Sequence, residues 1–202
     1  MFTKQLTNQD AESGALLLVL LEPPSLLEEE FNDWYDYEHF PQRLGTPGFI
    51  SGQRWVAIHG WPRYLARYTL ENYAVFESAE YRAISGANNS PWSKRILPRT
   101  IGRQRVAAQV LSQKVSSRPS TSLGLITWPL DDPALAEEVM VRASLLVSAL
   151  PGVIEHQWAQ TEGLLIYILG FDHVQAPEML ASLSRIGNVG ASKLNLYVRY
   201  TR

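Results

Sequence analysis

The hydrophobic pattern of the chain begins with one continuous apolar run, residues 15–21. Such a run is typical of a strand that is buried on both faces. It is far shorter than the ~20 residues that a membrane-spanning helix needs. A polar N-terminal stretch precedes it and an acidic stretch follows it without a small-residue cleavage site, which does not fit a secretory signal. The run therefore predicts a buried strand and no membrane segment.

The next segment predicts a helix. Glu22-Pro23-Pro24 ends the apolar run, and Ser25 and Glu28 have the spacing of a capping box. Acidic side chains at the start of a helix also interact favourably with its dipole. Pro41 has no amide hydrogen and disfavours helical geometry in the residue before it, so the helix is predicted to end or kink at about Phe40.

The remainder of the first half alternates strands with one further helix. Thr46-Pro47-Gly48 is predicted to form a turn. The elements expected after it are strands at Phe49–Ile58, Tyr64–Leu70 and Gln104–Val115, a helix at Tyr73–Ile84, a connection at residues 59–62 and a polar loop at Gly86–Trp92. The order of this half is βαββαβ.

The second half repeats that order. Its expected elements are strands at Leu123–Trp128, Val153–Ala159, Leu164–Phe171 and Lys193–Tyr200, with helices at Pro133–Leu150 and Pro177–Ile186. Pro47-Gly48-Phe49-Ile50 in the first half matches Pro151-Gly152-Val153-Ile154 in the second, each between a long helix and a strand. The sequence therefore predicts a tandem duplication, with a first repeat at 1–115, a linker at 116–122 and a second repeat at 123–202.

This order of elements indicates an α+β fold. One βαββαβ unit forms a four-stranded antiparallel sheet with both helices on one face, and the other face must be covered. We expect two such ferredoxin-like repeats to pack sheet to sheet as an α/β barrel around a cavity, with the helices outside. The chain would then be a monomeric pseudo-dimer, or such units would associate further as a homodimer.

The composition of the chain excludes several classes of function. The 202 residues carry 18 basic and 20 acidic side chains, a net charge of −2, without the basic excess of a nucleic-acid-binding protein. The chain has no cysteine, which excludes disulfides, thiol nucleophiles and cysteine-ligated metals and fits a cytoplasmic location. No phosphate-binding glycine loop, nucleophile elbow or HExxH motif is present, so the corresponding nucleotide and hydrolase chemistries lack their signatures.

The segment 31–44, FNDWYDYEHFPQRL, holds the main candidate, His39. Helical spacing places Phe31, Tyr35 and His39 on one face. An imidazole titrates near neutral pH, so His39 is a candidate proton donor or acceptor that needs no cofactor. The alternative is a structural histidine that fixes the helix end by bonding to the backbone or to Glu38.

The same segment resembles the dimeric α/β-barrel (ferredoxin-like) superfamily, and within it the EthD-like proteins. The resemblance depends on the helix end at residues 34–41, WYDYEHFP, on Arg43-Leu44, and on Thr46-Pro47-Gly48-Phe49 at the start of the second strand. Residues 64–68 then fall where the family has its third strand, so the match is best over residues 14–115. The resemblance implies a cavity with His39 near its mouth. Members of the family include cofactor-free enzymes that act on small aromatic or polyketide-like molecules, haem-binding enzymes and many proteins of unknown role. The resemblance therefore implies a small-molecule function of one of these kinds.

Several further side chains are candidates for contacting a substrate: Trp34, Tyr35, Arg54, Tyr64, Arg67, Tyr68 and Trp92. Aromatic side chains would line a pocket for a flat ligand, and a buried Arg or Tyr would pair with an oxygen-rich one. For the aromatic residues Trp34, Tyr35 and Tyr37 the alternative is core packing. For the strand residues the alternative is exposure outside the sheet, and for Trp92 it is anchoring a loop. Asp36 and Glu38 are expected to be solvated or to be local partners of Arg43.

The second repeat lacks the Glu-His pair that ends the helix of the first repeat. Alignment of the two Pro-Gly turns places Ala143 opposite His39, so the helix there is expected only to pack. His59 and His173 have no metal-ligand spacing with another histidine, and no metal or cofactor is expected.

Three hypotheses for the function follow. The first is a cofactor-independent lyase, dehydratase or isomerase acting on a small oxygenated or aromatic compound, with His39 as acid/base and Arg and Tyr side chains stabilising an enolate-like charge. The second is a non-catalytic protein that binds a small organic ligand. The third, ranked well below both, is haem binding.

Overall fold

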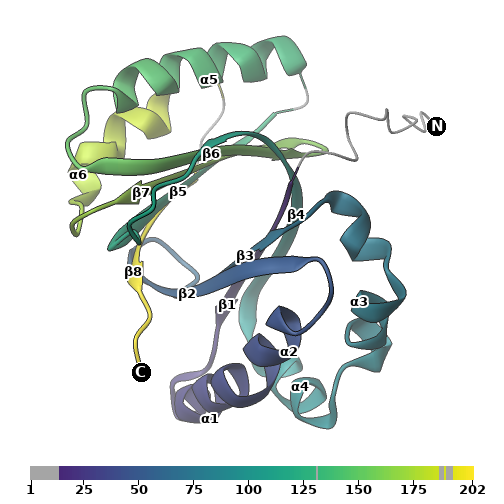
Figure 1. Cartoon of the computed structure of the whole chain (residues 1–202). Helices are drawn as coiled ribbons and strands as arrows, with labels where there is room; N and C mark the ends of the chain where they lie inside the picture. The colour runs from purple at the N-terminus through teal and green to yellow at the C-terminus, as the bar shows by residue number, and fades with distance from the viewer. Residues whose placement is uncertain (1–13, 131, 187–188, 190–192) are drawn as a thin grey trace. The chain divides into compact units, whose positions relative to one another are not determined.

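The computed structural model describes residues 14–130, 132–186, 189 and 193–202 (Figure 1). Residues 1–13 of the predicted first repeat therefore lie outside the described part. The strands pair in the order β1-β3-β2-β8-β5-β7-β6-β4, which returns to β1 and is the topology of a closed antiparallel barrel. The predicted α+β fold class is confirmed. None of the helices in the described residues is long and apolar enough to cross a membrane.

The described residues divide into two compact units, here named unit 1 (residues 14–53 and 64–109) and unit 2 (residues 54–63 and 110–202). Two strands continue from one unit to the other: β2 (Phe49–His59) and β4 (Ile101–Lys114). The predicted repeat boundaries at 116–122 and the duplication itself stay predictions.

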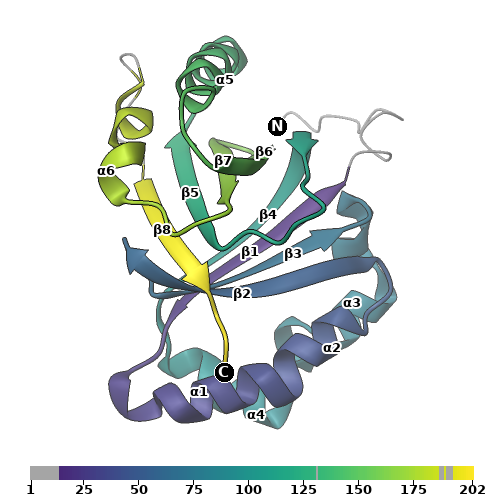
Figure 2. The same ribbon diagram turned by 60° about the vertical axis from the view of Figure 1, so that its left-hand side comes forward.

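Unit 1 is built around β1, the predicted buried strand. Its other elements are β3 (Tyr64–Leu70), parts of β2 and β4, and the helices α1 (Glu28–Trp34), α2 (Phe40–Leu44), α3 (Ala79–Ala83) and α4 (Pro91–Ile96). β1 (Ala15–Glu22) lies between β3 and β4, with Leu17 opposite both Tyr68 and Ala107. The four helices lie on one side of these strands (Figure 2), as the order of elements predicts.

The start of the first helix differs from the prediction. Ser25 opens a 3-10 turn, Ser25–Leu27, and α1 begins at Glu28 with no side chain capping it. The predicted capping box is therefore wrong. Glu28 instead accepts a hydrogen bond of 2.5 Å from the hydroxyl of Tyr64, so its carboxylate joins the helix to β3.

The helix continues past Pro41, so of the two predicted outcomes near Phe40, an end or a kink, the end is wrong. Between α1 and α2 the chain forms a π-helical segment, Tyr35–His39, with one more residue per turn than an α-helix. The amide of Phe40 bonds to the carbonyl of Tyr35 across this wider turn. Pro41 then falls in the first turn of α2, where a missing amide hydrogen costs little.

The predicted helix at 73–84 forms as two shorter pieces. A 3-10 helix spans Tyr73–Glu77, and α3 follows it. Ser78 between them is extended (φ −63°, ψ 153°), and its hydroxyl accepts a hydrogen bond from the amide of Tyr81. A serine that caps the second piece therefore interrupts the helix. The loop predicted at Gly86–Trp92 contains another 3-10 turn, Gly86–Asn88, and the start of α4; a last 3-10 turn, Leu97–Arg99, precedes β4.

Unit 2 packs its helices on one side of its strands (Figure 1). Its elements are the strands β5 (Ser122–Pro129), β6 (Val153–Thr161), β7 (Leu164–Phe171) and β8 (Lys193–Arg199), and the helices α5 (Pro133–Val147), α6 (Pro177–Leu180) and a 3-10 helix Ala181–Arg185. β5 pairs with β7 and β8, and β6 pairs with β7. All four strands were predicted to within two residues, whereas the helix predicted at 177–186 divides into α6 and the 3-10 piece.

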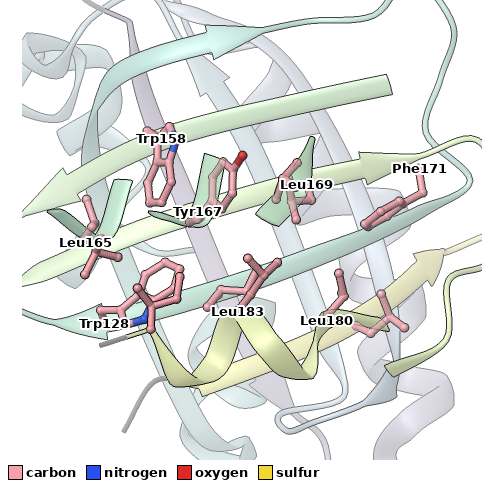
Figure 3. Packing of buried hydrophobic residues seen from close by; sticks show 14 residues of the cluster. Trp128, Trp158, Leu165, Tyr167, Leu169, Phe171, Leu180 and Leu183 are labelled. Atoms are coloured by element: carbon pink, nitrogen blue, oxygen red, sulfur yellow. The ribbon is translucent and has the colours of Figure 1, made fainter. Parts of the chain in front are cut away.

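The core of unit 2 is aromatic and aliphatic. The indole of Trp158 stacks on the ring of Tyr167, with centroids 3.7 Å apart and planes 6° from parallel. Leu180 and Leu183 reach this sheet from the α6 region (Figure 3). Ala143, the counterpart of His39 in the alignment of the turns, is fully buried in this cluster, in agreement with a packing role for α5.

Glycine is needed in both Pro-Gly turns. Gly48 and Gly152 have positive φ angles of 89° and 71°, which L side chains rarely adopt. A Cβ at Gly48 would also overlap the side chain of Val75, and one at Gly152 would overlap the ring of His173. Each turn thus brings the backbone too close to a neighbouring side chain for any other residue.

Candidate functional site

His39 lies at the end of the π-helical segment and is buried in unit 1, with only 7% of its surface exposed. Its imidazole centroid is 4.4 Å from the Trp34 ring and 5.3 Å from the Tyr35 ring. The ring of Phe31 is 5.3 Å from that of Tyr35, so the predicted helical face 31, 35 and 39 is confirmed. His39 therefore points into the protein and not into bulk water.

The electrostatic state of His39 follows from this burial. Burial and then the neighbouring positive charge of Arg43 lower the pKa of the imidazole from 6.5 to about 3. The imidazole is therefore neutral at physiological pH. Its buried Nδ1 has no hydrogen-bond partner in the described part of the chain. A neutral imidazole without this partner retains the capacity to bond to a ligand atom or to accept a proton.

Arg43 is the site residue that sequence reasoning missed. Only 5% of its surface is exposed, and its guanidinium carbon lies 5.2 Å from the centroid of the Tyr81 ring. Burial lowers the pKa of Arg43, against the opposing influence of Tyr81, Tyr68 and Tyr35. The sequence signal was the spacing of four residues from His39, which on a helix indicates a shared face.

The expected partnership of Glu38 with Arg43 is wrong. The carboxylate of Glu38 accepts hydrogen bonds from the hydroxyls of Ser90 and Ser93. Ser93 is fully buried, and its hydroxyl also accepts a bond of 3.0 Å from the indole nitrogen of Trp34. This network joins α4 to the π-helical segment and holds the indole that lies against His39.

Two of the predicted strand tyrosines face the same helices as His39. The ring of Tyr64 lies 5.1 Å from Phe31, and the ring of Tyr68 lies 5.3 Å from Phe40. Arg67 lies between them on β3, and since side chains alternate along a strand, it belongs to the opposite face. The structure therefore brings Tyr64 and Tyr68, but not Arg67, to the helix-covered side of unit 1 with Trp34 and Tyr35.

The two remaining candidates lie elsewhere. Trp92 is half-buried in α4, and its indole nitrogen donates to a carboxylate oxygen of Glu30 at 3.3 Å, a contact between α4 and α1. Arg54 belongs to unit 2, where its guanidinium carbon lies 4.0 Å from the centroid of the Tyr200 ring. Neither residue contacts His39 in the described interactions.

One of the histidines of unit 2, His156, has a buried ring nitrogen and was not singled out from the sequence. Its Nδ1 is buried without a hydrogen-bond partner among the described residues, and its ring lies 6.4 Å from that of Tyr167. Burial and then the charge of Lys114 lower its pKa. No arginine accompanies it in the described contacts, so this site lacks the pair formed by His39 and Arg43.

Metal binding has no support in the described residues, which contain no group of three His, Asp or Glu side chains arranged to hold an ion. The side chains described beside His39 are the rings of Trp34 and Tyr35 and the guanidinium of Arg43. This donor set suits an organic ligand with oxygen atoms more than a metal.

Comparison with known proteins gives the fold. No family model and no curated protein matches the chain. Among solved structures, an anthrone oxidase-like protein aligns with a TM-score of 0.67 at 11% identity, covering 94% of this chain and 92% of the other. A proposed monooxygenase from Lactobacillus acidophilus NCFM gives 0.61 at 12% identity, with 94% and 95% covered.

A third structure, a proposed chlorite dismutase, aligns with a TM-score of 0.60 at 8% identity and covers 94% of this chain and 95% of its own. At such low identity the three comparisons establish the fold alone. The chain shares with these proteins an α+β, ferredoxin-like arrangement of antiparallel strands and covering helices.

Proposed function

We propose that this protein is an EthD-like, cofactor-independent enzyme, a lyase, dehydratase or isomerase that acts on a small oxygenated or aromatic compound. His39 is its proton acceptor. The observation that carries the proposal is the neutral, buried imidazole of His39, whose Nδ1 has no partner among the described residues and which lies within a cluster of aromatic side chains. The names of the similar structures, an anthrone oxidase-like protein and a proposed monooxygenase, support a small-molecule function.

The chemistry uses one proton and one electron pair. His39 Nδ1 takes a proton from a carbon next to a carbonyl group, and the electrons of the C–H bond move to the carbonyl oxygen to give an enolate. Return of the proton to another carbon completes an isomerisation. Alternatively, the enolate expels hydroxide from the adjacent carbon. The proton that His39 took then joins the hydroxide to form water, which completes a dehydration.

The low pKa of His39 makes it a weak base in the unliganded protein. A negative charge that forms beside an imidazole raises its proton affinity. The enolate that forms in the reaction supplies this charge, so proton transfer becomes favourable only when ligand charge develops. This is the differential stabilisation of a transition state that catalysis requires.

The test is solvent deuterium exchange at the acidic carbon of a panel of small cyclic and aromatic ketones, followed by proton NMR. The protein should accelerate exchange of at least one compound, and His39→Gln should slow that exchange by about 10² or more. His59→Gln is the matched control, because His59 is exposed at the end of β2. Equal rates for His39→Gln and the parent would reject the role of His39.

A non-catalytic ligand-binding protein is the second candidate, and the same orphan Nδ1 favours it, since a ligand hydrogen bond alone would satisfy that atom. If this alternative holds, ligands should raise the unfolding temperature of the parent, and of His39→Ala nearly as much. Deuterium exchange should then not be accelerated. Haem binding is a distant third, and absence of a Soret band after haem addition would exclude it. Cytoplasmic location and a monomeric pseudo-dimer or homodimer remain parts of the proposal.

A further inference from the structure

Arg43 is a buried cation that has no counter-ion among the described residues. No carboxylate forms an ion pair with it in the part of the chain that the structure describes, and its buried Nη1 has no hydrogen-bond partner there. The nearest acidic residue in the helix sequence, Glu38, has its carboxylate bonded to serine hydroxyls. A buried charge is ordinarily paired, because removal from water is costly.

The side chains around Arg43 compensate only in part for the hydration that the guanidinium loses on burial. The ring of Tyr81 offers a cation–π contact at 5.2 Å, which is weaker than a hydrogen-bonded ion pair. Tyrosine side chains are neutral at physiological pH and do not cancel a positive charge. The second cation near this ring, Arg105, donates to the Tyr81 hydroxyl at 2.9 Å and is exposed to solvent. Arg43, in contrast, is buried and has no carboxylate partner among the described residues.

The imidazole of His39, like the guanidinium of Arg43, has a nitrogen without a described hydrogen-bond partner. His39 is 7% exposed and Arg43 is 5% exposed, and each has a buried nitrogen without a described partner. Arg43 follows His39 by four residues along the helix that continues into α2, so the two side chains share a face. A ligand with an anionic oxygen for Nη1 of Arg43 and a separate hydroxyl for Nδ1 of His39 would satisfy both nitrogens.

We infer that Arg43 is a specificity-determining residue that selects ligands with a carboxylate group, and that the ligand of this protein is a small aromatic or cyclic carboxylic acid. The inference deepens the proposed function, on which it depends for the identity of the site. A guanidinium presents a planar fork of N–H donors that matches the two oxygens of a carboxylate. Arg43 then fixes the acid group, while His39 remains opposite the rest of the molecule.

The stability of the unliganded protein should show whether Arg43 serves a ligand or the fold. If Arg43 served only the fold, its removal would destabilise the protein. A buried cation kept for a ligand costs stability in the ligand's absence, so replacement by an apolar side chain of similar length is neutral or stabilising. Arg43→Met should therefore leave the unfolding temperature of the unliganded protein unchanged or raise it.

The test measures binding of benzoate, 2-hydroxybenzoate and 4-hydroxybenzoate, each beside its neutral amide, by calorimetry and thermal unfolding. At least one acid should bind the parent about tenfold or more tightly than its amide. Arg43→Met should remove that preference, and Arg43→Lys should keep part of it because the charge remains. The control is Arg82→Met, which removes an exposed arginine of α3 in the same unit and should bind as the parent does.

The outcomes separate this inference from the proposed function. Equal binding of every acid and its amide, or parent-like preference in Arg43→Met, would overturn the carboxylate inference even if His39→Gln abolishes deuterium exchange. A lower unfolding temperature for Arg43→Met would also overturn it, since it would show a structural role. Carboxylate preference with no exchange activity would leave Arg43 as assigned and reject the enzyme.

Discussion

The imidazole of His39 lies against the indole of Trp34, with ring centroids 4.4 Å apart and planes inclined by 31°. The indole nitrogen of Trp34 donates to Ser93, which comes from α4, a helix far along the sequence. The position of the candidate base therefore depends on a contact between two helices. Ser93 acts on His39 only through Trp34 and is a positioning residue.

Ser93→Ala should destabilise the protein by about 1–3 kcal/mol, because it leaves the buried indole nitrogen of Trp34 without its acceptor. Urea unfolding followed by circular dichroism measures this loss. The pKa of His39, followed by NMR titration, should also change, since the ring that covers the imidazole is no longer fixed.

The control for this variant is Ser148→Ala. Ser148 also donates a hydrogen bond, to the carbonyl of Leu145, but it is exposed. Its replacement should alter stability by no more than about 0.5 kcal/mol. Similar losses for the two serines would contradict the importance of the Trp34 contact.

Stability should depend on pH through His39. The imidazole of the unfolded chain takes up a proton below its ordinary pKa of 6.5, whereas the folded imidazole does so only near pH 3. The unfolded state thus binds more protons in this window, and stability falls as pH decreases from 6.5 towards 3. The contribution is at most about 1.4 kcal/mol for each pH unit.

His39→Gln should remove this contribution. The difference between the unfolding free energies of parent and variant, measured in urea at several pH values, should be flat above pH 6.5 and change below it. The exposed residue His59 provides the control, since His59→Gln should leave the slope of the parent intact. Parallel curves for parent and His39→Gln would contradict the neutral, buried state of the imidazole.

The two Pro-Gly turns should not tolerate alanine. Gly48→Ala and Gly152→Ala combine a positive φ angle with overlap on Val75 and His173 respectively, so each should cost more than the backbone penalty alone. Gly86→Ala isolates that penalty, because Gly86 has φ 59° and nothing within 4 Å of an added Cβ. Its expected cost is about 1 kcal/mol. Thermal unfolding of the three variants gives the comparison, and equal losses would show that the overlaps relax without cost.

The core of unit 2 should depend on Trp158. This indole stacks on Tyr167 and is 2% exposed, so Trp158→Ala should cost about 3–5 kcal/mol through loss of burial and creation of a cavity. Unfolding in urea, followed by circular dichroism, measures it. Leu145→Ala, at a side chain of α5 that is 68% exposed, should cost far less. A loss below about 1 kcal/mol for Trp158→Ala would show that the stack contributes little.

The strands could be predicted because their signals are local. The apolar run at residues 15–21 and the alternation near residues 193–200 each reflect burial on the faces of one strand. Helix details were less predictable. Ser25 has the correct spacing for a capping box but no side-chain bond, and Ser78 breaks a helix that periodicity alone makes continuous. In both cases tertiary contacts outweigh the local pattern.

The candidate site was half predictable. His39 and Tyr35 follow from helical spacing, which needs only the sequence. Arg43 does not, because a charged side chain after a helix end is normally exposed, and Pro41 predicted that end. Only the continuation of the helix through α2 buries Arg43 beside His39. The separation of Arg67 from Tyr68 followed from alternation, but which face the helices cover required the structure.

The wider turn at Tyr35–His39 resembles the trace of a single inserted residue. If the same sequence followed α geometry throughout, every side chain after this stretch would be turned by about 100° relative to those before it. Arg43 would then leave the side of the helix that it now shares with Tyr81. The extra width of this one turn therefore sets the direction of the Arg43 side chain.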